Sequence, residues 1–191
     1  MCNAASFIVT KTQVFFGKYH DSHELMITDN GLKDKEPIDF VRTEIVPPNN
    51  DYKLPFDKWI FKTDQDILPN WYNMKWAEEQ CREALPEWAK THIYKSGNHK
   101  FENGNFSLIF FGNAKAEISS QTGGYCRFWE NSTGTVSRQT GGSCRFWENS
   151  TGTVSSQTGG DCYFQDNSAG TVSGQTEGYC RFWENSKVQR I

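Results

Sequence analysis

The sequence is 191 residues long, carries a formal net charge of −3 and is 36% hydrophobic. The slightly acidic balance argues against nucleic acid as a partner, and no apolar run reaches the roughly 18 residues of a membrane-spanning helix. The first residues lack the basic and apolar segments of a secretory signal, so we expect a soluble, cytoplasmic protein. Aromatic residues make up 15% of the chain, which predicts a core built from rings.

Residues 1–100 are predicted to form a small α+β domain. They hold all six prolines and all four histidines of the chain. Residues 6–17 alternate and are rich in β-branched and aromatic side chains, which predicts a hairpin or a long bent strand. Residues 40–48 and 57–65 predict two further strands, separated by a Pro/Asn loop.

Two helices are predicted in this domain. The first is short, with Asp21 or Ser22 as its N-cap and Gly31 as its end. The second occupies residues 68–94, where apolar residues recur at helical spacing. Pro86 lies inside this stretch and is expected to kink the helix or divide it in two.

Residues 103–191 are an array of eighteen-residue repeats. Four clear copies begin at glutamines: Gln121, Gln139, Gln157 and Gln175. A degenerate copy begins at Asn103. Identical side chains at a fixed spacing predict an all-β solenoid of about five coils, each with two short strands and two turns. A chain of β-hairpin repeats is the alternative, and the in-register recurrence of Cys, Phe and Asn favours the solenoid.

Side chains alternate between two faces within each copy. In the first clear copy Cys126, Phe128 and Val136 are predicted to point inward, while Arg127 and Trp129 point outward. At the turn, five asparagines are predicted to stack as an amide ladder between coils. They are Asn113, Asn131, Asn149, Asn167 and Asn185. The open C-terminal coil is expected to pair with another subunit.

The six cysteines include no Cys-x-x-Cys pair, which argues against a zinc site. Four of them recur at one position of the repeat, as buried thiols of a reduced chain would. We expect no disulfide framework, no metal and no cofactor.

The first half contains the segments "MCNAASFIVTK", "DSH", "VPPNNDY", "PFDKWIFKTDQDILPNWY" and "ALPEWA". In these it resembles a family of uncharacterised phage-encoded proteins. In that family an N-terminal domain beginning Met-Cys-Asn precedes a variable number of short Gly/Thr/Val-rich repeats. The repeats of this chain share the Gly-Thr-Val theme but are longer and more aromatic. The resemblance implies a viral origin, a two-part layout and a role in the cytoplasm of an infected cell, and it implies no activity.

One candidate function is enzymatic and centres on Cys2. Removal of Met1 would leave a free α-amine beside a thiol, the arrangement of N-terminal-nucleophile hydrolases. Asn3, His20, Asp21 and His23 are the polar residues available to orient or activate it. About 95 residues are few for the layered fold of such hydrolases. Helix capping by the Asp21 region is the simpler reading of this cluster.

The other candidate function is binding through an outward stripe of arginines and tryptophans. Its residues are Arg127, Trp129, Arg145, Trp147, Arg181 and Trp183. Stacked rings and guanidinium groups can bind a sugar chain, a nucleic-acid strand or a protein. From residue 103 onward seven Lys/Arg balance seven Asp/Glu, which argues against a phosphate backbone. Two Thr-Gly-Thr segments, at 133–135 and 151–153, resemble the arrays of ice-binding solenoids, but only two coils keep both threonines.

The sequence therefore favours a non-enzymatic interaction or assembly protein, with a solenoid stalk that oligomerises or binds a host macromolecule. We expect a homo-oligomer formed through the C-terminal solenoid edge or the aromatic stripe. A host protein is a possible further partner, and neither a membrane nor nucleic acid is expected. The alternative is a hydrolase or transferase with an N-terminal cysteine, in which the solenoid serves as an oligomerisation or targeting arm.

Overall fold

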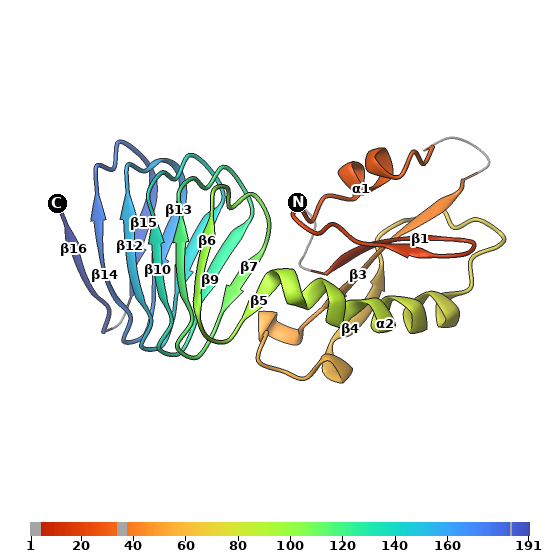
Figure 1. Cartoon of the computed structure of the whole chain (residues 1–191), viewed down its shortest axis with the longest axis horizontal. Coiled ribbons are helices and arrows are strands. Elements are labelled where there is room, and N and C mark those ends of the chain that lie inside the picture. The colour runs from red at the N-terminus through yellow and green to blue at the C-terminus, as the bar shows by residue number, and fades with distance from the viewer. Residues whose placement is uncertain (1–4, 34–37, 184) are drawn as a thin grey trace. The chain divides into compact units, whose positions relative to one another are not determined.

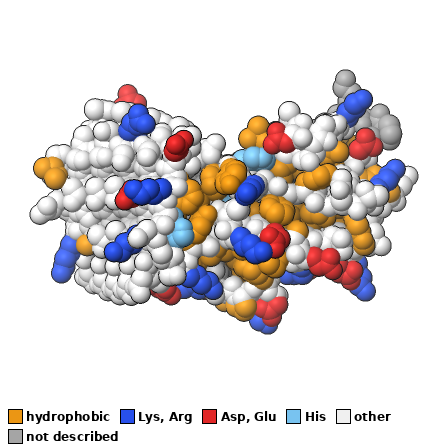
Figure 2. Space-filling model, in the orientation of Figure 1, with side chains coloured by type: hydrophobic (Ala, Val, Ile, Leu, Met, Phe, Trp, Pro, Cys, Tyr) orange, Lys and Arg blue, Asp and Glu red, His pale blue; other side chains and the backbone are white. Residues whose placement is uncertain are grey.

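The computed structural model describes residues 5–33, 38–183 and 185–191. The chain divides into two compact units, Met1–Thr91 and His92–Ile191 (Figure 1). The first is a region of mixed helix and strand and the second is a β-solenoid, so the predicted fold class is confirmed. On the face seen in Figure 2 the solenoid is covered mainly by backbone and small polar side chains, with scattered charges.

The N-terminal unit is built on a four-stranded antiparallel sheet with the order β2-β1-β3-β4. Its strands are β1 Ser6–Thr10, β2 Val14–Phe15, β3 Phe40–Val46 and β4 Ile60–Thr63. β1 and β2 form the predicted hairpin, and β1 is buried along its whole length because it lies between β2 and β3. Two short 3-10 turns, η1 Pro48–Asn50 and η2 Phe56–Lys58, lie between β3 and β4.

Two α-helices accompany this sheet. α1 spans His23–Asp29, and the Ser22 hydroxyl accepts a hydrogen bond from the Leu25 backbone N–H, as expected of an N-cap. Gly31 follows with a φ of +64°, a backbone conformation that glycine adopts without strain. α2 is one helix over Met74–His92 with Pro86 inside it, so of the two predicted effects of Pro86, a kink or a division, the division does not occur.

The solenoid is made of two parallel sheets of six strands each, and it makes about five turns over residues 93–190. The odd-numbered sheet contains β5 Ile93–Tyr94, β7 Leu108–Phe110, β9 Tyr125–Phe128, β11 Ser143–Phe146, β13 Thr158–Phe164 and β15 Glu177–Phe182. The even-numbered sheet contains β6 Asn98–Phe101, β8 Lys115–Ile118, β10 Thr133–Val136, β12 Thr151–Ser155, β14 Ala169–Ser173 and β16 Lys187–Arg190. Corresponding residues of successive coils pair in register, which rules out the hairpin alternative.

The first coil begins before the recognisable repeats. β5 and β6 pair with β7 and β8, so the predicted division between residues 1–100 and 103–191 falls inside the solenoid. Sixteen positions separate Ile93 from its partner Ile109, and seventeen separate Asn98 from Lys115. The spacing of eighteen holds only in later coils, and this difference hides the first coil from a search for a fixed period.

A column of stacked phenylalanine rings fills the solenoid core. The ring centroids of Phe110, Phe128, Phe146 and Phe164 follow one another at 4.7, 4.8 and 4.6 Å, with planes within 14° of parallel. Across the core a Cβ at Gly134 would overlap the Phe128 ring. The glycine of each Gly-Thr-Val segment is therefore required because the ring opposite occupies the space of a side chain.

Candidate interaction surfaces of the solenoid

Of the three residues predicted for catalysis, the structure describes Asp21 and His23. Cys2 lies outside the described residues, and Asp21 directly precedes the N-cap of α1. His23 is 2% exposed, and both of its ring nitrogens face protein groups. Its Nε2 lies 3.2 Å from the Thr43 carbonyl oxygen and its Nδ1 lies 3.5 Å from Asp64 Oδ2. Through the contact with Thr43, the His23 imidazole links α1 to β3 of the sheet.

Cys81, the other cysteine outside the repeats, is also embedded. Its thiol lies 3.5 Å from the Thr43 hydroxyl, and burial raises the pKa of Cys81 to about 12. A thiol with this pKa remains protonated at neutral pH and is a poor nucleophile. Among the described residues no group of three or more His, Cys, Asp or Glu side chains is placed to hold a metal ion.

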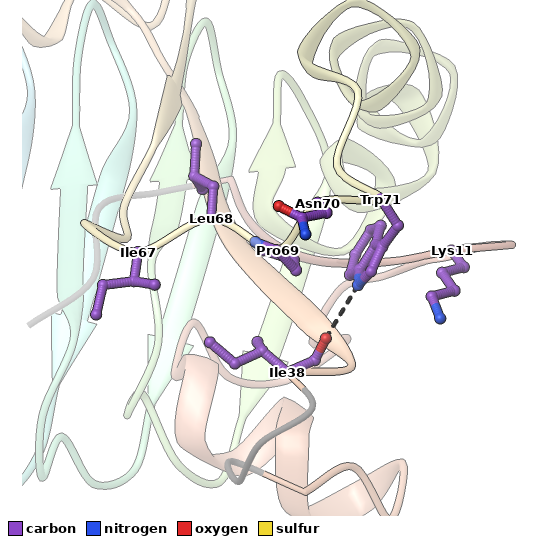
Figure 3. A pocket seen from close by; sticks show the side chains of 7 residues that line it. All are labelled: Lys11, Ile38, Ile67, Leu68, Pro69, Asn70 and Trp71. Carbon is purple, nitrogen blue, oxygen red and sulfur yellow. Dashed lines mark hydrogen bonds between the residues drawn. The ribbon is translucent and has the colours of Figure 1, made fainter.

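A pocket in the N-terminal unit lies beside the segment before α2 (Figure 3). It has a volume of about 360 Å³ and is lined by Lys11, Ile38, Ile67, Leu68, Pro69, Asn70 and Trp71. The Trp71 indole N–H donates to the Ile38 carbonyl at 3.0 Å across this pocket. Lys11 is its single ionisable lining residue, so the pocket lacks an acid–base pair.

The outward stripe exists, but its rings are packed on each other. Trp129 lies between Phe111 and Trp147, at centroid distances of 5.1 and 4.6 Å and with planes within 17° of parallel. Because both faces of this indole are covered, it has no face left for a ligand to stack on. This part of the stripe stabilises the stack of coils.

The stripe changes in the next coil, where Gln165 stands in the position of the tryptophans. There the Tyr163 ring stacks on Trp183 at 5.5 Å, and the Arg145 guanidinium lies 4.9 Å from the Tyr163 ring centroid. Arg181 lies 5.5 Å from the centroid of Tyr179. The cation–π contacts predicted for a ligand are thus made within the solenoid itself.

The exposed aromatic side chains in and beside the stripe lie in β15 or directly after it. Tyr179 is 64% exposed and Trp183 is 36% exposed, and Arg181 between them is also exposed. Trp129, by contrast, is buried. Of the predicted stripe, Arg181 in β15 and Trp183 directly after it are the exposed residues.

The amide ladder is formed by glutamines, and the predicted asparagine ladder is wrong. The asparagines of the repeats are exposed, whereas Gln121, Gln139 and Gln157 are fully buried. Gln121 Nε2 donates to the Ser143 carbonyl at 3.2 Å, and its Oε1 accepts from the Cys144 thiol at 2.6 Å. The sequence did contain a signal for this glutamine ladder. A glutamine begins every clear copy, and such strict recurrence at a turn indicates a structural role.

A second ladder is formed by acidic residues at the opposite turn. Glu130, Glu148 and Asp166 all have φ between 55° and 59°. The Glu148 carboxylate accepts from the Glu130 backbone N–H at 3.0 Å, and Asp166 accepts from the Glu148 N–H at 3.2 Å. Each carboxylate therefore satisfies a backbone donor of the coil before it, which the sequence pattern did not reveal.

The terminal coil, β15 and β16, ends both sheets of the solenoid, and, as at the first coil, no strand of the described chain pairs with its outer edges. Cys180 is 9% exposed and Phe182 is half-buried, although their equivalents one coil earlier are fully buried. Arg190 partly covers this end. Its Nη2 donates to the Cys180 carbonyl at 3.0 Å, and its guanidinium carbon lies 4.9 Å from the Phe182 ring centroid.

The thiols of the last two coils, Cys162 and Cys180, interact with each other. Cys162 and Cys180 face each other in register. A hydrogen bond with the Cys162 thiol, together with the charge of Arg190, lowers the pKa of Cys180. The same hydrogen bond and burial raise the pKa of Cys162. Cys180 is therefore the member of the pair that ionises first.

The fold and these surfaces define the chain as a two-unit β-solenoid protein. Its most exposed aromatic side chain among the described residues, Tyr179, lies in the terminal coil beside an unpaired strand edge. Comparison with protein families, curated proteins and solved structures finds no match. Among the described residues, no helix is both long and apolar enough to cross a membrane.

Proposed function

We propose that the chain is a non-enzymatic assembly protein whose solenoid associates with a second copy through the terminal coil. The observation that carries this proposal is the unpaired outer edge of β15 and β16 above a partly covered core. Unpaired strand edges are templates for pairing with another chain. The exposed part of Phe182 adds apolar area that association would bury.

The side chains around this edge support a protein partner. Tyr179, Arg181 and Trp183 belong to the three residue types that dominate binding energy in protein interfaces. The equal numbers of acidic and basic residues along the solenoid disfavour a nucleic acid as the ligand of these side chains. The resemblance to phage-encoded proteins supports the cytoplasm of an infected cell as the place of assembly and a host protein as a further partner.

Sedimentation velocity over a concentration series tests this proposal. We expect the wild-type chain to shift from monomer to dimer as concentration rises, and we expect Tyr179→Ser together with Trp183→Ser to move that shift to higher concentration. Tyr19→Ser is the matched control, since Tyr19 is 60% exposed on the N-terminal unit. A wild-type chain that stays monomeric throughout the series would show that the proposal is wrong.

A further inference from the structure

The outer strand of the terminal coil has a self-complementary charge pattern. Glu177 and Arg181 lie two residues before and two residues after Tyr179, and all three side chains are exposed. A two-fold axis through Tyr179 would place each Glu177 opposite an Arg181 of the second copy. The same strand is therefore its own charge complement when two copies meet in antiparallel orientation.

The backbone of β15 offers the matching hydrogen-bonding groups. The Phe164 carbonyl accepts from the Trp183 N–H, so the backbone carbonyl at the Phe164 position of a coil points toward the following coil. Phe182 pairs with Phe164 and Cys180 with Cys162, so they occupy the same positions one coil later. Their N–H and C=O groups therefore face the outer edge of the solenoid.

We infer that a second copy of this chain adds its β15 antiparallel to β15, about a two-fold axis through Tyr179. This inference rests on the proposed self-association and specifies its register. The two Tyr179 rings become neighbours, and two Glu177–Arg181 pairs flank them on the outer face. Direct cross-strand partners of this kind lie about 5 Å apart, close enough for opposite charges to attract.

The two-fold arrangement also closes the assembly. A head-to-tail contact would need the edge of the first coil, β5 and β6, and would continue into a filament. An antiparallel β15 pair uses the same edge on both copies, so the assembly ends at a dimer. This difference in stoichiometry is visible in solution.

Arg190 competes with the second copy for the edge. In the single chain its Nη2 donates to the Cys180 carbonyl, and its guanidinium lies over Phe182. In the dimer the second copy requires the Cys180 carbonyl as a backbone acceptor, because Cys180 lies one residue from the two-fold axis. Arg190 must then move aside, so it limits the strength of association.

Charge reversal tests the register. Glu177→Arg or Arg181→Glu alone places like charges opposite each other twice per dimer, and we expect each to raise the dimer Kd about tenfold or more. The double variant restores opposite charges, and its Kd is expected to return to within about threefold of wild type. Glu79→Arg, an exposed site on α2, controls for the change in net charge. Arg190→Ser is expected to lower the Kd.

The outcomes separate the inference from the function it rests on. A wild-type chain that never dimerises overturns both. A wild-type dimer whose Kd is unchanged in the single reversals, or not restored in the double variant, overturns the two-fold register while self-association stands. A wild-type assembly larger than a dimer overturns the closed arrangement. Circular dichroism of each variant confirms that the solenoid is folded in every comparison.

Discussion

Removing one ring from the middle of the phenylalanine column tests the physical basis of the solenoid. Phe146 is fully buried and stacks on Phe128 and Phe164 at 4.8 and 4.6 Å. Truncation of a buried phenylalanine to alanine costs about 3–5 kcal/mol, and it also removes two ring contacts here. We expect Phe146→Ala to lower the free energy of unfolding by about 4 kcal/mol, a large share of the stability of a typical domain.

The matched control is the last ring of the same column. Phe182 is half-buried, has one ring neighbour at 5.8 Å, and lies in the terminal coil. Phe182→Ala is expected to cost about 1–2 kcal/mol, because less area returns to water and the neighbouring coil loses one contact. Urea unfolding followed by circular dichroism and tryptophan fluorescence measures both variants. Equal losses, within about 0.5 kcal/mol, would refute the reasoning that the column is stabilised by two-sided stacking.

Three further predictions concern the core and the thiols. Gly152→Ala places a methyl group into the Phe146 ring and is expected to cost about 2 kcal/mol. In Gly123→Ala the methyl group meets only the Asn105 carbonyl oxygen, at an ordinary contact distance of 3.8 Å, and stability is expected to change by less than about 0.5 kcal/mol in the same assay. Because burial raises the pKa of Cys81 to about 12 from its ordinary value of 9.0, its neutral thiol stabilises the fold below pH 9, and this contribution is lost as pH rises toward 12. Cys81→Ala is expected to remove that part of the alkaline loss of stability, and an unchanged pH profile would contradict it. In native alkylation with mass mapping we expect Cys180 to react before Cys81, and the reverse order would contradict the pKa directions given above.

The repeats made the architecture predictable. The recurrence of Cys, Phe and Val at eighteen-residue spacing indicated which side chains share the core, and the structure confirms Cys126, Phe128 and Val136 as buried. The first coil could not be found in the same way, because its strands are sixteen and seventeen positions from their partners. A period search detects equal spacing and misses a coil with a shorter turn.

The surface features were harder to predict for a physical reason. Asparagine and glutamine both recur in every clear copy, and periodicity alone does not tell which corner turns its side chain inward. Gln139 lies at the turn before an odd-numbered strand and is buried, whereas Asn131 lies at the turn after one and is exposed. Arg190 over Phe182 is a contact between two strands of one coil, so it depends on the shape of the coil and has no sequence signature.

Disulfide trapping at the proposed two-fold axis tests the central claim most directly. Tyr179→Cys brings two thiols together only if β15 strands meet in antiparallel register, since a disulfide requires Cα atoms roughly 4.4–6.8 Å apart. We predict a covalent dimer under mild oxidation, and none for Asp161→Cys at the equivalent position one coil earlier. A Tyr179→Cys chain that remains monomeric, or cross-links no more than Asp161→Cys, would contradict the account.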